Sequence, residues 1–159
     1  MLFWRFCSLL LALMLLCVSL PAQAGSVDFK YLDLSGKDFS SQSLIEAEFS
    51  HCTLDQTDFS NSDLRGAVFS QSTMIEADLH GADFTYGIAY LVKFTDADLR
   101  DALFVETDLL RSSFDNAEIT GADFSYAILE RSELKKLCSR ATGVNSKTGV
   151  STRDSLECN

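Results

Sequence analysis

A period of five residues constrains this chain more than any other feature of its sequence. Taking every fifth residue from Phe29 to Leu134 gives 22 positions, and all of them are apolar. Every phenylalanine beyond residue 24 falls on this series. An α-helix repeats every 3.6 residues and a strand every 2, so neither produces the pattern, and it is not the repeat of a coiled coil. The period predicts a chain that turns a corner every five residues and points one large side chain inward on each side.

The residues around each large position complete a five-residue unit. A small residue such as Ala77 or Ala97 stands two places before most large residues, and Asp or Glu directly precedes the large residue at 13 of the 22 sites. The remaining two positions are mostly polar. Four such sides would close a coil of 20 residues, and coils would stack at the strand spacing of about 4.8 Å. The sequence therefore predicts an all-β solenoid, in which each coil is stabilised by its neighbours.

Residues 20 apart should stack in columns. One inward column is formed by Leu44, Leu64, Phe84, Phe104 and Phe124. A second column has Ala89 where a large residue is expected, so we expect a local irregularity there, with Ile88 or Tyr90 partly filling the gap. Sequence drift within a tolerant repeat is the simpler interpretation, and a small surface pocket flanked by Tyr86 and Tyr90 is the functional one.

The repeat resembles that of the pentapeptide-repeat proteins, whose pattern is A(D/N)LXX. The match is clearest at Ala77–Gly81, Ala97–Asp101 and Ala122–Tyr126, and the resemblance covers about residues 27–134. It implies a right-handed quadrilateral β-helix. It does not imply an activity, because one fold hosts many functions.

The N-terminus has the features of a secretory signal peptide. Arg5 is its only charge, an apolar run of 15 residues spans Phe6–Leu20, and Ala22–Ala24 provides a small-x-small cleavage site. We predict a signal peptide over 1–24 that is cut after Ala24. A retained membrane anchor is the alternative, but a spanning helix needs about 20 apolar residues, so we expect no stable anchor.

Cleavage would leave an acidic chain in an exported compartment. The number of Lys and Arg residues would fall from 13 to 12, and the 23 Asp and Glu residues would remain, which gives a net charge of −11. This charge argues against nucleic acid as a partner, because binding to phosphates needs clustered Lys and Arg.

The five-residue pattern stops after Leu134. We predict a β-helix over 25–134 and a C-terminal cap over 135–159, with a short helix over 128–141 and a second that Ser151 or Thr152 caps and that runs to Glu157. A disulfide between Cys138 and Cys158 would stabilise the fold by roughly 3 kcal/mol, because it closes a loop of the unfolded chain. Two free thiols are the alternative. Cys52 occupies a small inward position and should be a buried free thiol.

The tail also resembles the C-terminal cap of thylakoid-lumen pentapeptide proteins. The match lies in the paired cysteines, in a turn from Asn145 to Gly149 and in the run Thr152–Leu156. With the signal peptide, it implies the thylakoid lumen, with the periplasm as the alternative. The lumenal members of the family have no agreed biochemical activity, so the resemblance implies a location rather than a reaction.

One outward column, which we call the acid column, consists of Asp38, Asp58, Asp78, Asp98 and Glu118. Its carboxylates would lie about 5 Å apart. In one interpretation each acid bonds local backbone and the side chains splay apart. In the other the column binds cations or a basic partner, repulsion raises the pKa values, and the fold becomes more stable as pH falls.

A second outward column, the tyrosine column, consists of Tyr86, Glu106 and Tyr126. Together with Tyr90 it is a candidate contact surface for a protein, although scattered surface tyrosines would give the same pattern.

No catalytic constellation stands out, and we expect no cofactor. The sequence favours a non-enzymatic structural or interaction protein that presents a rigid acidic β-helix to a protein partner. One alternative is a DNA mimic that binds gyrase, if the chain is not exported. The other is a thiol–disulfide redox protein that uses Cys138 and Cys158.

Overall fold

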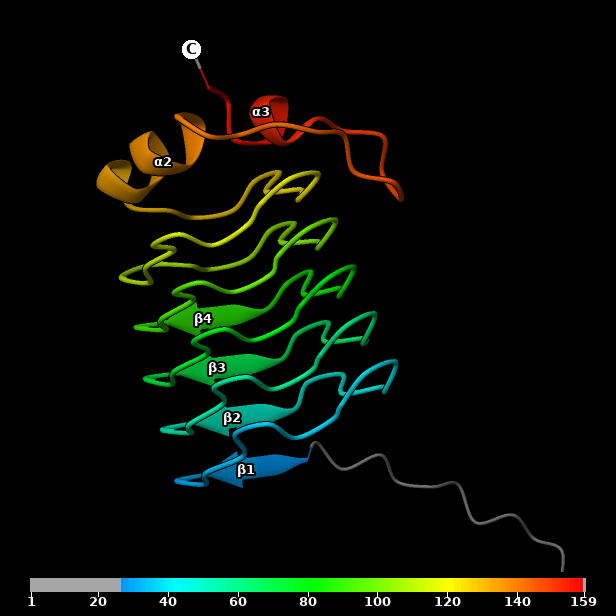
Figure 1. Cartoon of the computed structure of the whole chain (residues 1–159), viewed down its shortest axis with the longest axis vertical. Helices are drawn as coiled ribbons and strands as arrows, with labels where there is room; N and C mark the ends of the chain where they lie inside the picture. Colours follow the sequence, from blue (N-terminus) through cyan, green and yellow to red (C-terminus); the bar gives the residue numbers. More distant parts are fainter. Residues whose placement is uncertain (1–26, 159) are drawn as a thin grey trace, which may run out of the picture.

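The computed structural model describes residues 27–158, which form a stack of coils closed at one end by two helices (Figure 1). The predicted signal peptide, residues 1–24, lies outside the described residues.

One side of the stack is a four-stranded parallel sheet in the order β1-β2-β3-β4. Its strands are β1 (Asp28–Lys30), β2 (Glu48–Ser50), β3 (Val68–Ser70) and β4 (Ile88–Tyr90). Neighbouring strands pair residues 20 apart, so Phe29 lies opposite Phe49. Parallel bridges on the other sides keep the same offset, as between Asp33 and Thr53. Each coil therefore takes 20 residues, which confirms the predicted β-helix.

Each corner places one residue in the left-handed region of the backbone. Every fifth residue from Tyr31 to Tyr126 has a φ between 52° and 75°, and only four of these residues are glycines. The N–H of Ala67 donates to the carbonyl of Leu64 at 2.9 Å around one such corner. A positive φ at the third residue of a four-residue turn is the type II geometry. This conformation costs a non-glycine residue roughly 1–2 kcal/mol. At every corner from Tyr31 to Glu106, the hydrogen bond from the residue's own N–H to the coil above opposes that cost.

Stacked phenylalanine rings fill much of the interior. The rings of Phe29, Phe49 and Phe69 lie face to face with centroids 4.7 Å apart in both pairs. Such pairs contribute about 0.5–1.5 kcal/mol beyond the burial of their area. Every large position from Leu44 to Phe124 is buried, as predicted. The large residues at the two ends of the series, including Phe29, are only partly buried because one neighbouring coil is missing there.

Polar residues at the small inward positions bond to the backbone of the coil below. The hydroxyl of Thr107 donates to the carbonyl of Phe84 at 2.9 Å, and that of Ser112 donates to the carbonyl of Ala89 at 2.6 Å. These bonds satisfy hydroxyl groups that would otherwise be costly to bury.

At Ala89 the interior is filled differently from the sequence-based expectation. Ala89 stays in register opposite Phe69 and is fully buried. Ile88 and Tyr90 flank it in β4, and side chains alternate along a strand, so both point outward; Ile88 is 40% exposed. The Phe84 ring lies against Gly87, where an added Cβ would be 2.3 Å from the ring. The expectation that Ile88 or Tyr90 fills the gap is therefore wrong.

The cap contains helices α2 (Arg131–Cys138) and α3 (Thr152–Ser155). Leu137 of α2 is fully buried against the last coil, and Ser151 caps α3 by accepting from the N–H of Asp154 at 3.0 Å. Both helices are shorter than expected, and α2 starts later because Ile128 still pairs with Asp108 in the stack. Within residues 27–158 no helix has the length and apolarity that a membrane crossing requires.

Candidate functional site

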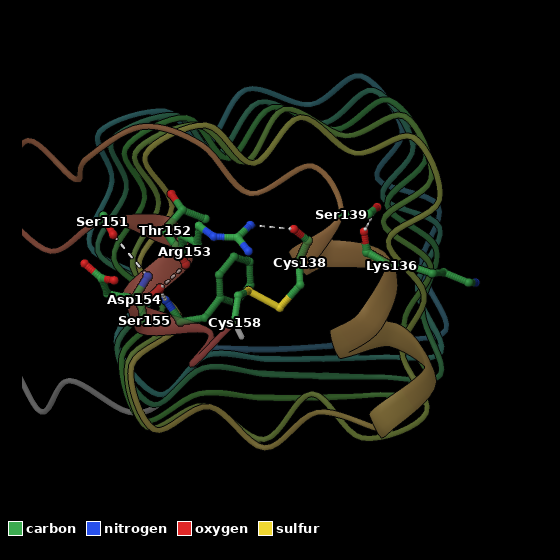
Figure 2. The surroundings of a disulfide bond; sticks show 10 residues. Lys136, Cys138, Ser139, Ser151, Thr152, Arg153, Asp154, Ser155 and Cys158 are labelled. Atoms are coloured by element: carbon green, nitrogen blue, oxygen red, sulfur yellow. Dashed lines mark hydrogen bonds between the residues drawn. A yellow bond between two sulfur atoms is a disulfide. The ribbon is translucent and has the colours of Figure 1, made fainter.

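The cap is held by the predicted disulfide between Cys138 and Cys158, whose Cα atoms are 5.5 Å apart (Figure 2). It joins the end of α2 to the segment after α3, and Arg153 donates to the carbonyl of Cys138 at 3.1 Å beside it. Cys52 is a buried free cysteine, as expected, and its thiol donates to the carbonyl of Phe29 at 3.0 Å.

The cap replaces part of the coil that would otherwise come next. In the regular stack, N–H groups on the upper edge of each coil donate to the coil above. At the last coil the cap supplies substitute acceptors: the carboxylate of Glu133 for the N–H of Phe114, the carbonyl of Thr142 for that of Gly121, and the hydroxyl of Ser155 for that of Phe124. Helices can therefore end a β-helix without leaving these donors unpaired.

Asn145 fastens the cap loop to two coils of the stack. Its buried amide donates to the carbonyl of Gly121 at 2.8 Å and to that of Asp101 at 3.1 Å. Its side-chain oxygen accepts from the N–H groups of Lys147 and Thr148 at 2.9 and 3.0 Å. The sequence indicated a turn at this asparagine, but not its partners 24 and 44 residues earlier.

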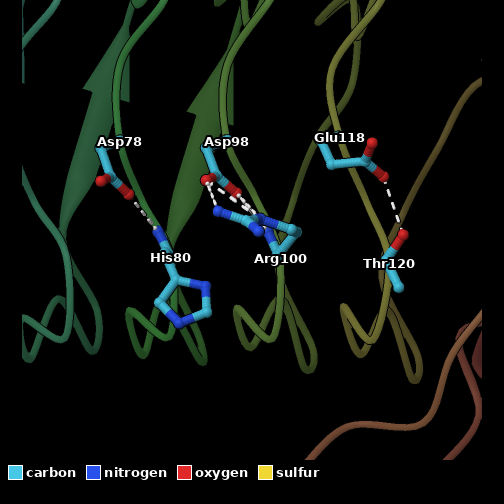
Figure 3. Close-up of polar contacts among 6 residues, drawn as sticks. All are labelled: Asp78, His80, Asp98, Arg100, Glu118 and Thr120. Atoms are coloured by element: carbon cyan, nitrogen blue, oxygen red, sulfur yellow. Dashed lines mark hydrogen bonds and ion pairs between the residues drawn. The ribbon is translucent and has the colours of Figure 1, made fainter.

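The acid column is assembled as predicted, because its members form parallel bridges one above another from Asp38 to Glu118. Figure 3 shows three members, Asp78, Asp98 and Glu118, and each carboxylate bonds to the residue two places further along its own coil. Asp78 accepts from the N–H of His80 at 2.8 Å, and Asp98 accepts from both the N–H and the guanidinium of Arg100. This geometry favours the interpretation in which the acids bond local backbone.

The pKa values of two members of the acid column are lowered, so the prediction that repulsion raises them is wrong there. Burial raises the pKa of Asp98, but the hydrogen bonds and charge of Arg100 outweigh it and hold the pKa below its usual range. Hydrogen bonds from Ser40 lower the pKa of Asp38 in the same way.

Cation binding by the acid column, the second interpretation of the sequence, stays a prediction. Within the part of the chain that the structure describes, no group of three or more His, Cys, Asp or Glu side chains is arranged to hold a metal ion. The guanidinium of Arg100 already binds both carboxylate oxygens of Asp98.

The tyrosine column lies on one corner of the stack. The N–H of Tyr86 donates to the coil that carries Glu106, and the N–H of Glu106 donates to the coil that carries Tyr126. The side chains of Tyr86 and Tyr126 are 63% and 81% exposed. Tyr90 lies apart from this column, partly buried in β4 and below the guanidinium of Arg111 at 5.9 Å from its ring centroid. The structure thus brings three of the four candidate contact residues together.

Sequence reasoning missed a cavity between the last coil and the cap. Its volume is about 340 Å³, and its lining includes Phe124, Leu129 and Leu134 from the end of the repeat and Leu156 from the cap. The only signal in the sequence is the end of the five-residue pattern, which leaves the last large residues without a coil above them.

Known proteins share this sequence pattern. The profile of the family described as Pentapeptide repeats matches 8 copies, over residues 26–61, 54–85 and 93–131. A thylakoid lumenal protein of Arabidopsis thaliana, TL20.3, is 52% identical over 42 residues, which are 26% of this chain and 15% of that protein. The thylakoid lumenal 15 kDa protein 1 of the same plant is 48% identical over 48 residues, 30% of this chain and 21% of that protein. The matches thus span about a fifth or less of these relatives.

Solved structures share the architecture over much more of the chain. A pentapeptide repeat protein from the thylakoid lumen of Arabidopsis thaliana is 41% identical with a TM-score of 0.60, covering 80% of this chain and 89% of that one. A pentapeptide repeat protein from Nostoc is 28% identical with a TM-score of 0.52, covering 59% and 79%. The five-residue period, the 20-residue coil and these matches agree, and the chain belongs to the pentapeptide-repeat family.

Proposed function

We propose that this protein is a non-enzymatic interaction protein that presents a rigid β-helix surface to a protein partner in an exported compartment. The thylakoid lumen is the first candidate compartment and the periplasm the second. Similarity to a lumenal protein over 89% of that protein's solved chain supports the lumen, as does the predicted signal peptide.

The observation that carries the proposal is the tyrosine column. Tyrosine is enriched at protein interfaces because it offers a large, rigid contact area with one polar end. Tyr86 and Tyr126 are exposed on one corner of the stack, where the N–H groups of Tyr86 and Glu106 donate to the next coil. A rigid scaffold loses little conformational entropy when a partner binds.

The charge of the chain suggests what the partner carries. The full sequence has a formal net charge of −10 at pH 7. An acidic surface steers basic surfaces toward it and speeds their association, an effect that salt weakens. We therefore infer a partner with a basic contact surface.

Site-specific photocrosslinking tests the proposed surface. A photoreactive phenylalanine at Tyr86 should give one discrete adduct with a single protein, and Glu106→Lys should weaken that adduct. Tyr31 is the matched control, since it is 74% exposed and has the same left-handed backbone on a different corner. Equal adducts from positions 86 and 31, or none from 86, would contradict the proposal.

Fractionation tests the compartment separately. The protein should be resistant to protease in intact thylakoids and become sensitive once the membranes are opened. In a bacterial host it should leave the cell with the osmotic-shock fraction. Recovery with the cytoplasm would reject both locations.

Thiol–disulfide exchange is a second candidate, because both cysteines of the disulfide are only partly buried. The reduction potential of the Cys138–Cys158 disulfide decides between thiol–disulfide exchange and a purely structural bond. A value below about −300 mV is typical of a structural bond, and a higher one of an exchangeable bond.

A further inference from the structure

On the side of the last coil that carries Tyr126, the cap leaves three neighbouring backbone groups uncovered. Within residues 27–158, no donor or acceptor pairs with the N–H of Tyr126, the carbonyl of Ala127 or the N–H of Leu129. We call these three groups the open edge. They lie between the point where Ser155 of the cap accepts from Phe124 and the point where the chain enters α2.

The coil below shows what would pair with the open edge. There the corresponding groups all bond to the next coil. The N–H of Glu106 donates to Ser125 at 2.9 Å, and the carbonyl of Thr107 accepts from the N–H of Ile128 at 2.9 Å. The carbonyl of Ile128 in turn accepts from Leu109 at 3.0 Å. One residue of an added strand thus supplies both an N–H and a carbonyl, and the side chain of the next residue points inward, as Leu129 does.

A cavity with a mixed lining lies beside that inward position. Its volume is about 340 Å³, and the lining combines the apolar side chains of Phe124, Ala127, Leu129, Leu134 and Leu156 with the polar residues Tyr126, Ser155 and Glu157. Its volume is at the lower end of the range for small-ligand sites and is ample for one large apolar side chain.

The charged residues that line the cavity and the hollow beside it are acidic. Glu157 lines it, and a second hollow of about 150 Å³ beside it is lined by Glu157 and Asp154. Among the described residues that line the two hollows, none is Lys or Arg. The exposed ring of Tyr126 borders both.

We propose that the open edge receives an extended, basic peptide segment of the partner protein, which adds a short strand to the stack and buries one large apolar side chain in the cavity. Main-chain hydrogen bonds would give the affinity, and the cavity would select the side chain, as in other cases of strand addition. This inference rests on the proposed function, since it assigns the partner a second point of contact.

A defined peptide library tests it on the full chain. The probes are acetylated octapeptides with Lys at three outer positions and each of Leu, Ile, Phe, Met and Trp in turn at the inward position. We expect at least one of them to bind, with the N–H groups of Tyr126 and Leu129 exchanging about tenfold more slowly in the complex. Methylating the backbone nitrogen of the residue before the inward one should weaken binding about tenfold, because it removes one hydrogen bond. Failure of every probe to bind, or protection confined to other amides, would overturn the inference.

Two variants sharpen the test. Glu157→Lys should weaken binding about tenfold, and Ala127→Phe should abolish it by filling the cavity. Asp96→Lys is the control for the first, because Asp96 is also an exposed acid with a left-handed backbone. If Glu157→Lys and Asp96→Lys weaken peptide binding equally, the proposed binding site is wrong, and this holds even if Ala127→Phe proves unstable.

The two proposals fail separately. If the peptides do not bind but position 86 still gives its specific adduct, the protein interaction stands and the open edge has no role in it. If the peptides bind at the open edge and position 86 gives no adduct, strand addition stands and the tyrosine column is not the contact surface.

Discussion

The behaviour of the outer carboxylates depends on the residue two places along the chain. Asp78 and Asp98 occupy the same position in successive coils, but the first is followed by His80 and the second by Arg100. The pKa of Asp98 is lowered by Arg100. A carboxylate whose pKa is lower in the folded state stabilises the fold at pH values above its unfolded pKa of about 3.9. This stability is lost as pH falls through the folded value, so acid weakens the fold here, against the sequence-based prediction.

We predict that Asp98→Asn lowers the melting temperature at pH 7 by about 1–4 °C, the range expected for an exposed ion pair. The difference from the parent protein should shrink as pH falls from 4 toward 3, because the parent loses the same charge there. Thermal melts from pH 7 to 3 measure this. Asp78→Asn is the control, since it removes a carboxylate from the same column without an arginine partner. A constant difference across the whole pH range would contradict the assigned role of Asp98.

Gly87 is required because the Phe84 ring occupies the place of a Cβ atom. We predict that Gly87→Ala costs about 1–3 kcal/mol of unfolding free energy, as overpacking does elsewhere. In a Phe84→Leu background the same change should cost less than about 1 kcal/mol, because the ring is gone. Denaturant titration of the double-mutant cycle gives the coupling. Additive effects would show that the ring does not fill this space.

The cap is the element that adapts a β-helix to its end. It uses side-chain and backbone oxygens to replace a missing coil, and it is fastened by one asparagine and one disulfide. The described cap residues bond to the coils of Gly81, Asp101 and Gly121, so removal of the cap should affect these coils first.

We predict that Asn145→Ala costs about 2–4 kcal/mol, because the side chain makes four hydrogen bonds and leaves buried carbonyls unpaired when it is removed. Hydrogen exchange should speed up first around Gly121. Ser146→Ala, at the exposed neighbouring residue, is the control and should change little. If Asn145→Ala and Ser146→Ala lower the unfolding free energy by the same amount, the amide of Asn145 does not hold the loop.

We predict that replacing Cys138 and Cys158 together by serine costs roughly 3 kcal/mol, from the entropy that the disulfide removes from the unfolded chain. Amides of the cap should then exchange faster, while those of β2 and β3 keep their protection. The reduced parent protein should behave in the same way. A uniform loss of protection in every coil would contradict a local role for the bond.

Over the whole molecule, stability is distributed along a stack in which each coil touches only its neighbours. Phe104 is fully buried one coil below the last, and its ring stacks on that of Phe124 with centroids 5.1 Å apart. A substitution that disrupts packing at such a position interrupts the contact between the coils below it and the coil that carries the cap.

We predict that Phe104→Asp unfolds the upper half of the stack, because an unpaired buried charge costs several kcal/mol. Phe104→Leu, which keeps an apolar residue found at many equivalent positions, should cost about 1–3 kcal/mol. Circular dichroism and the melting temperature report both. An aspartate variant with the parent's β signal and melting temperature would contradict the burial of this column.

Much of the fold follows from local sequence. Because the period of five recurs in every unit, the length of the coil and the inward direction of Phe49 or Leu64 can be predicted without knowing any distant partner. The stacking of the acid column from Asp38 to Glu118 follows from the same arithmetic. The left-handed corners could not be predicted, because most of the residues there, such as Glu46 or Glu106, have no local preference for that conformation. The ladder of hydrogen bonds between coils imposes it.

Tertiary contacts alone decided the remaining features. The place of the Phe84 ring depends on Gly87, because a Cβ there would collide with the ring. Asn145 reaches a carbonyl 44 residues away. The open edge exists because the cap covers the last coil on some sides and not on others. The sequence determined what every coil has in common, since that information repeats every five residues. The structure determined what happens where the repetition ends, because there each backbone group must find a partner that no local pattern specifies.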